Sequence, residues 1–219
     1  MNIPKSWTFS SSEVASGFND HVKAELPWYD LATWAVATIA RHYVPSNGLI
    51  YDIGASTGNI SRALEDVVRN SGSRLVAIEK EQSMADRHIG CGELVVCDAL
   101  DYDFQKYDFA VIFLTMMFMP IAKRKEWLMN MVSKINAGGA IVIFEKEEPK
   151  GGFLSTAIYR MTLEAKLNAG VDPVNIIKKE LSLGGFQRPI TQYELPVRKT
   201  EIFRFGDFSG WLIEAQSCP

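Results

Sequence analysis

Short apolar segments alternate with amphipathic segments through most of the chain after residue 45. Apolar residues predict strands, and a helical repeat of apolar positions predicts the helices between them. The segment 109–114 is apolar throughout, as is typical of a strand buried on both faces. The alternation predicts a parallel, doubly wound α/β sheet. The predicted strands are 49–53, 74–79, 94–97, 109–114 and 140–144, and the helices between them are 59–69, 83–88 and 123–135.

The first 45 residues follow a different pattern. Phe18, Val22, Leu26 and Tyr29 recur at spacings of three and four, which predicts an amphipathic helix. The helical spacing resumes after Pro27, where we expect a bend. We therefore expect residues 1–45 to form a helical cap on a core of residues 46–219.

The end of the chain completes the expected fold. Residues 153–167 and 173–183 are predicted helices, and 200–214 alternates around a glycine like an antiparallel hairpin. Gly138 and Gly139 are expected to end the helix before them. We expect one domain over 1–219, a Rossmann-like, seven-stranded, mostly parallel sheet with an antiparallel terminal hairpin.

Composition and charge narrow the class of protein. Apolar residues make up 47% of the chain and charged residues 22%, as in ordinary globular proteins. The longest apolar runs are shorter than the roughly 20 residues that span a bilayer, and the first residues lack the features of a signal peptide. We therefore expect a cytoplasmic protein without membrane contact. The net charge of −3 favours a small-molecule partner over nucleic acid.

The three cysteines do not suggest a metal site. Cys91, Cys97 and Cys218 show no Cys-x-x-Cys spacing. A free cysteine in or beside a strand behaves as a small apolar residue. We expect reduced thiols and no bound metal.

A glycine turn follows the first predicted strand. Asp52 ends this strand, and Gly54 and Gly58 follow it before a helix begins. Gly54 lets the chain turn where a side chain would collide with a ligand, and Gly58 lets the helix, with its free N–H groups, come close. Asp52 is suited to the ammonium group of an amino-acid moiety. Turns of this kind also occur without any ligand.

Two further acidic residues end the next two strands. Glu79 is placed to accept the hydroxyls of a ribose, and Asp98 to accept a hydrogen bond from an adenine amino group. Met84 starts the intervening helix, where it could lie against an adenine. Singly, Glu79 could be only a neighbour of a helix cap, and Met84 a core residue. Together with the glycine turn, the acids predict a nucleoside site at the carboxyl edge of the sheet.

These motifs resemble the class I S-adenosylmethionine-dependent methyltransferases between residues 52 and 146. The matching parts are the Asp-x-Gly-x-x-x-Gly turn, Glu79, Asp98 and the apolar fourth strand. The turn lacks the Gly-x-Gly-x-x-Gly pattern of dinucleotide-binding enzymes. The resemblance implies S-adenosylmethionine (SAM) as cofactor and methyl transfer as the reaction.

A closer resemblance is to the carboxy-S-adenosylmethionine synthases, which act in tRNA wobble-uridine modification. It rests on the segments 18–22, 26–29, 115–119, 136–140, 144–146 and 205–210. Because these synthases are dimers, a homodimer is a possibility that the resemblance raises. The cofactor-binding residues expected from the motifs and the resemblance are Tyr29, Asp52, Gly54, Ala55, Ser56, Gly58, Glu79, Lys80, Met84, Asp98, Ala99 and Leu114.

Two departures from the synthases favour ordinary methyl transfer. The synthases have an Asn where this chain has Phe113 or Leu114. They also have an Arg, which pairs with the extra carboxylate of the modified cofactor, where an ungapped match puts Glu180. A carboxylate facing a carboxylate is unfavourable. In a different register the cation could come from Lys178, Lys179 or Arg188, which leaves the synthase reaction as an alternative, beside a non-catalytic SAM-binding module.

Several residues are candidates for contact with the methyl acceptor. His21 and Tyr29 in the cap, and Glu145 at the end of the fifth strand, are candidate catalytic residues. Tyr159 and Arg160 could clamp an acidic acceptor. In the alternative interpretation His21 lies on a helix surface and Glu145 in a solvated loop. The function expected is SAM-dependent methyl transfer, with a small molecule favoured as acceptor.

Overall fold

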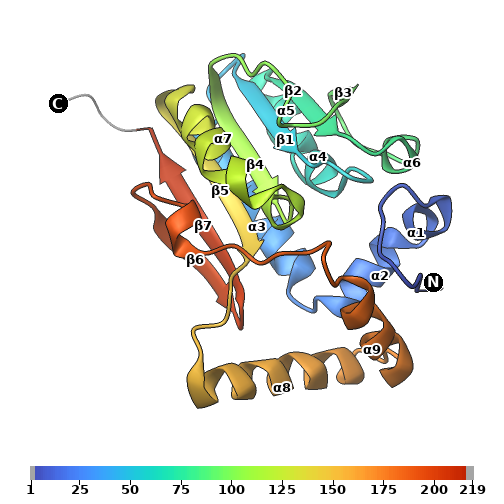
Figure 1. The fold of residues 1–219 in the computed structure, drawn as a ribbon. Helices are drawn as coiled ribbons and strands as arrows, with labels where there is room; N and C mark the ends of the chain where they lie inside the picture. Colours follow the sequence, from blue (N-terminus) through green and yellow to red (C-terminus); the bar gives the residue numbers. More distant parts are fainter. Residues whose placement is uncertain (1–2, 216–219) are drawn as a thin grey trace.

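A seven-stranded sheet forms the centre of the structure, a computed structural model that describes residues 3–215 (Figure 1). The strand order is β3-β2-β1-β4-β5-β7-β6. Strands β1 to β5 run parallel to one another, and β7 is antiparallel to both of its neighbours, β5 and β6. The strands are β1 Leu49–Ile53, β2 Arg74–Glu79, β3 Glu93–Val96, β4 Tyr107–Phe113, β5 Ile135–Lys146, β6 Thr200–Phe205 and β7 Phe208–Glu214. The predicted mostly parallel sheet with a terminal antiparallel hairpin is confirmed.

Both faces of the sheet are covered by helices, so the central strands are buried on both sides. Along β4, Phe109, Val111 and Phe113 pack in one apolar cluster, whereas Ala110 and Ile112 pack in another. The first cluster includes residues of α3 Tyr29–Tyr43, α4 Asn59–Ala63 and α5 Glu65–Ser71, and the second includes residues of α7 Ile121–Ser133. Alternate side chains of a strand point to opposite faces, which explains why this strand is apolar at every position.

The remaining helices gather near the carboxyl ends of the strands. In Figure 1, α8 runs along the bottom of the view, and α1, α2 and α9 lie to its right. The backbone N–H of Trp7 donates to the carbonyl of Ser182 at 3.0 Å, which joins the N-terminal segment to α9. These helices are α1 Ser12–Ser16, α2 Phe18–Glu25, α6 Gln82–Ala85, α8 Gly152–Asn168 and α9 Pro173–Ser182, with short 3-10 turns η1 Met116–Phe118 and η2 Gln192–Glu194.

The helical N-terminal region therefore has two parts. Only the segment up to α2 caps the carboxyl ends of the strands. In α3, by contrast, Ala32, Val36 and Ala40 are fully buried against the sheet. Small side chains at spacings of four let this helix pack closely on the strands.

The expected role of Gly138 and Gly139 is wrong. The helix α7 ends at Ser133, and both glycines lie inside β5. A Cβ on Gly139 would lie 2.4 Å from the carbonyl oxygen of Asp108 on β4. Gly139 thus allows two strand backbones to approach where their register shifts.

In the described part of the chain, no helix combines the length and the apolar character needed to cross a membrane. Cys91 and Cys97 are free thiols, whereas Cys218 lies outside the described residues. Within residues 3–215, no three histidine, cysteine or acidic side chains are grouped so that they could hold a metal ion.

Candidate functional site

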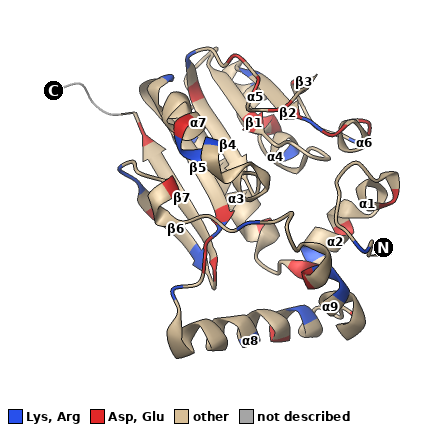
Figure 2. Cartoon of the chain, in the orientation of Figure 1, with Lys and Arg blue, Asp and Glu red and all other residues tan. Residues whose placement is uncertain are grey.

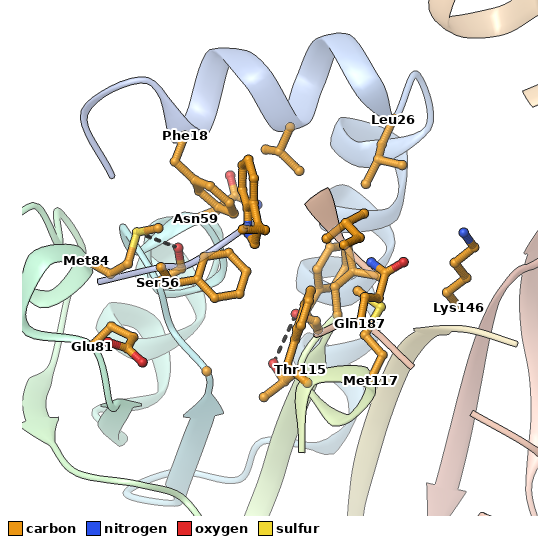
Figure 3. A pocket seen from close by; sticks show the side chains of 18 of the residues that line it. Phe18, Leu26, Ser56, Asn59, Glu81, Met84, Thr115, Met117, Lys146 and Gln187 are labelled. Atoms are coloured by element: carbon orange, nitrogen blue, oxygen red, sulfur yellow. Dashed lines mark hydrogen bonds between the residues drawn. The ribbon is translucent and has the colours of Figure 1, made fainter. Parts of the chain in front are cut away.

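A cavity of about 260 Å³ lies at the carboxyl ends of β1, β2 and β4, beneath the N-terminal segment. Its walls come from the turns after these strands and from α2, α8 and α9. Figure 3 shows Phe18 at the start of α2 and Leu26 just after its end, Ser56 and Met84 on one side, and Thr115 and Met117 in the turn after β4. Residues far apart in sequence therefore meet at one edge of the sheet, the usual place for a ligand in such folds.

The turn between β1 and α4 forms the floor of this cavity. Gly54 has φ +73°, and a Cβ there would lie 2.3 Å from the hydroxyl oxygen of Thr115. Gly54 is therefore required by the neighbouring turn of the protein itself. Gly58 does not line the cavity, because it faces the backbone of Ile89, whose carbonyl oxygen would lie 2.6 Å from an added Cβ. Its role in the structure is to let segments of the chain pack together.

Replacing Gly54 with alanine should lower the free energy of unfolding by about 3 kcal/mol or more, because strain at positive φ adds to a clash. Gly170 has φ +81°, and an added Cβ there would meet no atom within 4 Å. Gly170→Ala is the matched control and should cost only about 1 kcal/mol. Urea denaturation of both variants measures the two losses of free energy of unfolding. Equal losses would mean that the clash between the added Cβ and Thr115 costs nothing.

The three predicted acids meet in the cavity wall. Asp52 is only 1% exposed, and the Ser61 hydroxyl donates a 2.6 Å hydrogen bond to its Oδ2. Burial raises the pKa of Asp52 to about 6. Asp98, which is half-exposed, accepts the backbone N–H of Leu100 at 2.9 Å and lies 3.6 Å from the Lys80 ammonium. Asp52 is thus the buried acid of the site and Asp98 an acid at its rim.

Glu79 is held in place by two backbone donors. Its Oε2 accepts the N–H of Ser56 at 2.8 Å, and its Oε1 accepts the N–H of Glu81 at 2.8 Å. Burial raises the pKa of its carboxyl group. Each carboxylate oxygen has a second lone pair, so Glu79 can accept two further hydrogen bonds from a ligand in the cavity.

The other predicted cofactor residues surround these acids. Met84 is 1% exposed and belongs to the apolar cluster under the N-terminal segment, so it is a core residue, and it also lines the cavity. The Ser56 hydroxyl lies 3.8 Å from its sulfur (Figure 3). Lining the same cavity are Tyr29, Ala55, Lys80, Ala99 and Leu114.

Two of the candidate catalytic residues face the cavity. Tyr29 is buried against Phe113, with ring centroids 5.4 Å apart, and burial raises the pKa of its phenol. His21 stacks on Trp7 at 5.6 Å. Burial, together with the charge of Lys179, lowers the pKa of His21 to about 4, so its imidazole is neutral at pH 7.

Glu145 and Arg160 do not reach the cavity. The Glu145 carboxylate is fully buried and accepts the backbone N–H groups of Thr115 at 2.8 Å, Met116 at 2.5 Å and Met117 at 3.2 Å. Glu145 is therefore neither a catalytic residue in the cavity nor part of a solvated loop, as the two sequence interpretations expected. Its carboxylate holds the turn after β4. Arg160 lies exposed on α8, whereas its neighbour Tyr159 lines the cavity.

A cluster of charged residues at the cap end of the cavity was missed by the sequence analysis. The Lys166 ammonium lies 2.8 Å from Glu25 and 3.0 Å from Glu180. These charges come from α8, α2 and α9, which lie side by side at the lower right of Figure 2. Only the tertiary structure brings them together, so no local sequence signal marks the cluster.

Lys179 is the exception in this cluster. It is 9% exposed and its ammonium lies over the ring of Trp7, but it forms no ion pair within the described residues. Burial lowers its pKa from 10.5 to about 6. Beside it, the buried atoms Trp7 Nε1, His21 Nε2 and Glu25 Oε1 have no hydrogen-bond partner among residues 3–215. The cap end therefore holds polar groups that a ligand can satisfy.

Replacing Lys179 with methionine should stabilise the protein by about 1–3 kcal/mol at pH 7, because an unpaired buried amine is lost. Between pH 10.5 and about 6 the unfolded chain binds a proton that the folded chain does not. The native protein therefore loses stability as the pH falls through this window, and the gain in the variant should be larger at pH 6.5 than at pH 9.5. Lys178→Met, at an exposed neighbour, is the control. Urea denaturation at both pH values measures the free energy of unfolding of each variant. Equal changes in Lys179→Met and Lys178→Met would contradict the effect of burial.

Comparison with known proteins gives this geometry a context. No protein-family model matches the chain. It is 28% identical to the carboxy-S-adenosyl-L-methionine synthase of Staphylococcus epidermidis over 95% of this chain and 92% of the relative. It is 27% identical to the synthase of Shewanella pealeana over 91% of this chain and 85% of the relative.

Solved structures decide the fold. Human N-acetylserotonin methyltransferase, solved in complex with SAM, aligns with a TM-score of 0.61 and 12% identity. That alignment covers 95% of this chain and 58% of the human protein, so the chain spans little more than half of it. The plantazolicin methyltransferase BpumL, in complex with SAH, aligns with a TM-score of 0.60 and 13% identity over 93% and 90% of the two chains. This is the class I methyltransferase fold.

Within this methyltransferase fold, the predicted resemblance to the carboxy-S-adenosylmethionine synthases is confirmed along nearly the whole chain. The structure changes the interpretation of one departure from them. Glu180 is paired with Lys166, and the adjacent Lys179 lines the same cavity. A ligand carboxylate at this end would therefore not face an unpaired Glu180, which weakens the argument from repulsion.

Proposed function

We propose that the protein is a SAM-dependent methyltransferase that acts on a small acceptor. The observation that carries the proposal is the meeting of Asp52, Glu79 and Asp98 in one cavity beside the glycine turn. Acids of this kind at successive strand ends suit a cationic nucleoside with an amino-acid moiety. The similarity to proteins named for SAM chemistry supports the same ligand.

The residues present fit this cofactor. Burial raises the pKa of Asp52. The ammonium group of SAM would give this carboxylate a cationic partner and favour its charged form. Glu79 has free lone pairs that can accept hydrogen bonds from the ribose hydroxyls. Asp98 would accept a hydrogen bond from the adenine amino group, near Met84. When bound, SAM supplies a methyl group on a sulfonium, and the protein then has mainly to position the acceptor and exclude water.

The other end of the cavity suits an acceptor with a flat or apolar body and a polar group. Met117 and Phe118, in the turn after β4, give it apolar walls. His21 and Tyr29 face the same space, and His21 Nε2 has no hydrogen-bond partner in the described part of the chain. A neutral imidazole can hydrogen-bond an acceptor hydroxyl or amine, whereas the Tyr29 phenol stays protonated and can donate.

Incubation with SAM carrying a deuterated methyl group and a small-molecule extract tests the proposal. Mass spectrometry should find a labelled product together with S-adenosylhomocysteine. The same incubation with Asp52→Ala is the control and should give neither. Absence of any labelled product, with SAM bound to the protein, would favour the non-catalytic SAM-binding module.

A second function is supported by different observations. The curated relatives are named carboxy-S-adenosyl-L-methionine synthases, and Lys179 offers a buried amine without an acidic partner in the described chain. In this alternative Lys179 would pair with the carboxylate of the modified cofactor. Mass spectrometry of the nucleoside released from purified protein separates the two functions. The carboxylated cofactor supports the synthase, and SAM or S-adenosylhomocysteine supports methyl transfer.

A further inference from the structure

A chain of hydrogen bonds leads from the protein surface to the buried acid of the cavity. His88 Nε2 lies 3.3 Å from the Ser61 hydroxyl, and this hydroxyl donates to Asp52 Oδ2 at 2.6 Å. Ser61 is fully buried, and His88, after α6, is half-buried. Because the Ser61 proton is committed to Asp52, its oxygen remains as the acceptor for a proton on His88 Nε2.

Two glycines make room for this arrangement. A Cβ on Gly58 would lie 3.0 Å from His88 Nε2. A Cβ on Gly90 would lie 2.5 Å from the Ser61 Cβ and 2.9 Å from His88 Cε1. Side chains at either position would push the imidazole away from Ser61. The requirement for glycine at 58, which the cavity does not explain, thus comes from the Ile89 backbone first and from His88 as well.

Burial and a neighbouring positive charge both favour the neutral form of His88. Burial, and then the charge of Arg62, lowers the pKa of His88. Arg62 itself donates to the carbonyls of Thr57 at 2.9 Å and Ile89 at 2.8 Å, which fixes the segment that carries His88. The Cys91 thiol donates to the Ser61 carbonyl at 3.0 Å. A neutral imidazole carries one N–H, which the geometry assigns to Nε2.

We propose that His88 is a positioning residue for the cofactor: it orients the Ser61 hydroxyl, which in turn fixes the Asp52 carboxylate toward the ammonium group of SAM. This inference rests on the proposed function. Without His88, the Ser61 hydroxyl can rotate away, and Asp52 then keeps only the backbone donor of Ser61 and loses the side-chain donor that favours its charged form. No local motif marks His88, which is 36 residues from Asp52.

Calorimetric titration of SAM into His88→Ala, His88→Gln and Ser61→Ala tests the chain of contacts. His88→Ala and Ser61→Ala should each weaken SAM binding by about 5- to 20-fold, less than the loss of a direct hydrogen bond between a charged group and the ligand, because both residues act through Asp52. His88→Gln should restore most of the affinity, because its amide can donate from the place of Nε2. The double variant His88→Ala/Ser61→Ala should bind no more weakly than Ser61→Ala alone.

A ligand without the amino-acid moiety separates positioning from general damage to the fold. The affinity for 5′-methylthioadenosine, measured by competition, should stay unchanged in His88→Ala. His42→Ala, at an exposed histidine of α3, is the matched control and should bind both ligands normally. Unchanged SAM affinity in His88→Ala, or an equal loss for both ligands, would overturn the inference. Failure of the unmodified protein to bind SAM would instead overturn the proposed function.

Discussion

Replacing Glu79 with glutamine should weaken SAM binding by about 10- to 100-fold. The carboxylate is fixed by the backbone N–H groups of Ser56 and Glu81, and its remaining lone pairs face the cavity. The variant replaces one of the two acceptor oxygens with a donor and removes the charge, and a hydrogen bond to a charged group contributes about 1.5–3 kcal/mol. Isothermal calorimetry at constant pH measures the change.

The neighbouring Glu81 provides a control for the loss of charge. Glu81 also lines the cavity, but its backbone, not its side chain, binds Glu79. Glu81→Gln should bind SAM within about threefold of the unmodified protein. If Glu79→Gln and Glu81→Gln lost affinity for SAM equally, the loss would come from the change in net charge and not from a specific contact of Glu79. The melting temperature of each variant shows whether the turn remains folded.

Replacing Arg124 with methionine should lower the free energy of unfolding by about 3–5 kcal/mol. This side chain is fully buried and donates to the carbonyls of Met119 at 3.0 Å and Arg188 at 3.0 Å. It also forms a 2.9 Å ion pair with Glu194. Removing it leaves a buried carboxylate and several carbonyl groups without a donor, which is among the most costly kinds of substitution.

Lys125→Met tests whether the position on the helix matters. Lys125 follows Arg124 on α7 but is exposed, so its replacement should change the free energy of unfolding by less than about 0.5 kcal/mol. Urea denaturation of both variants gives the comparison. A loss below about 1 kcal/mol in Arg124→Met would contradict the view that Arg124 joins α7 to the segments before β6.

The fold could be predicted because its strands are short, apolar and separated by helices. The segment 109–114 is apolar throughout since both faces of β4 are covered. The acids at 52, 79 and 98 could be predicted to meet because parallel strands end at one edge of a sheet. These inferences need only local patterns and the regular geometry of a parallel sheet.

What the sequence could not reveal depends on contacts between distant segments. Glu145 looks exposed among charged neighbours, yet it is buried because the turn after β4 supplies three backbone donors. Gly58 looks like part of a ligand loop but serves the packing of His88 and Ile89. The pairing of Lys166 with Glu25 and Glu180 requires α2, α8 and α9 to meet, and no periodicity along the chain encodes that meeting.

The central claim is that the cavity binds SAM, and calorimetric titration of the purified protein with SAM, with NAD as the comparison, tests it most directly. We expect saturable binding of one SAM per chain and no detectable heat of binding for NAD, because the turn at Gly54 and Gly58 lacks the glycine pattern of a dinucleotide site. Binding of NAD in place of SAM, or of neither nucleoside, would contradict the account.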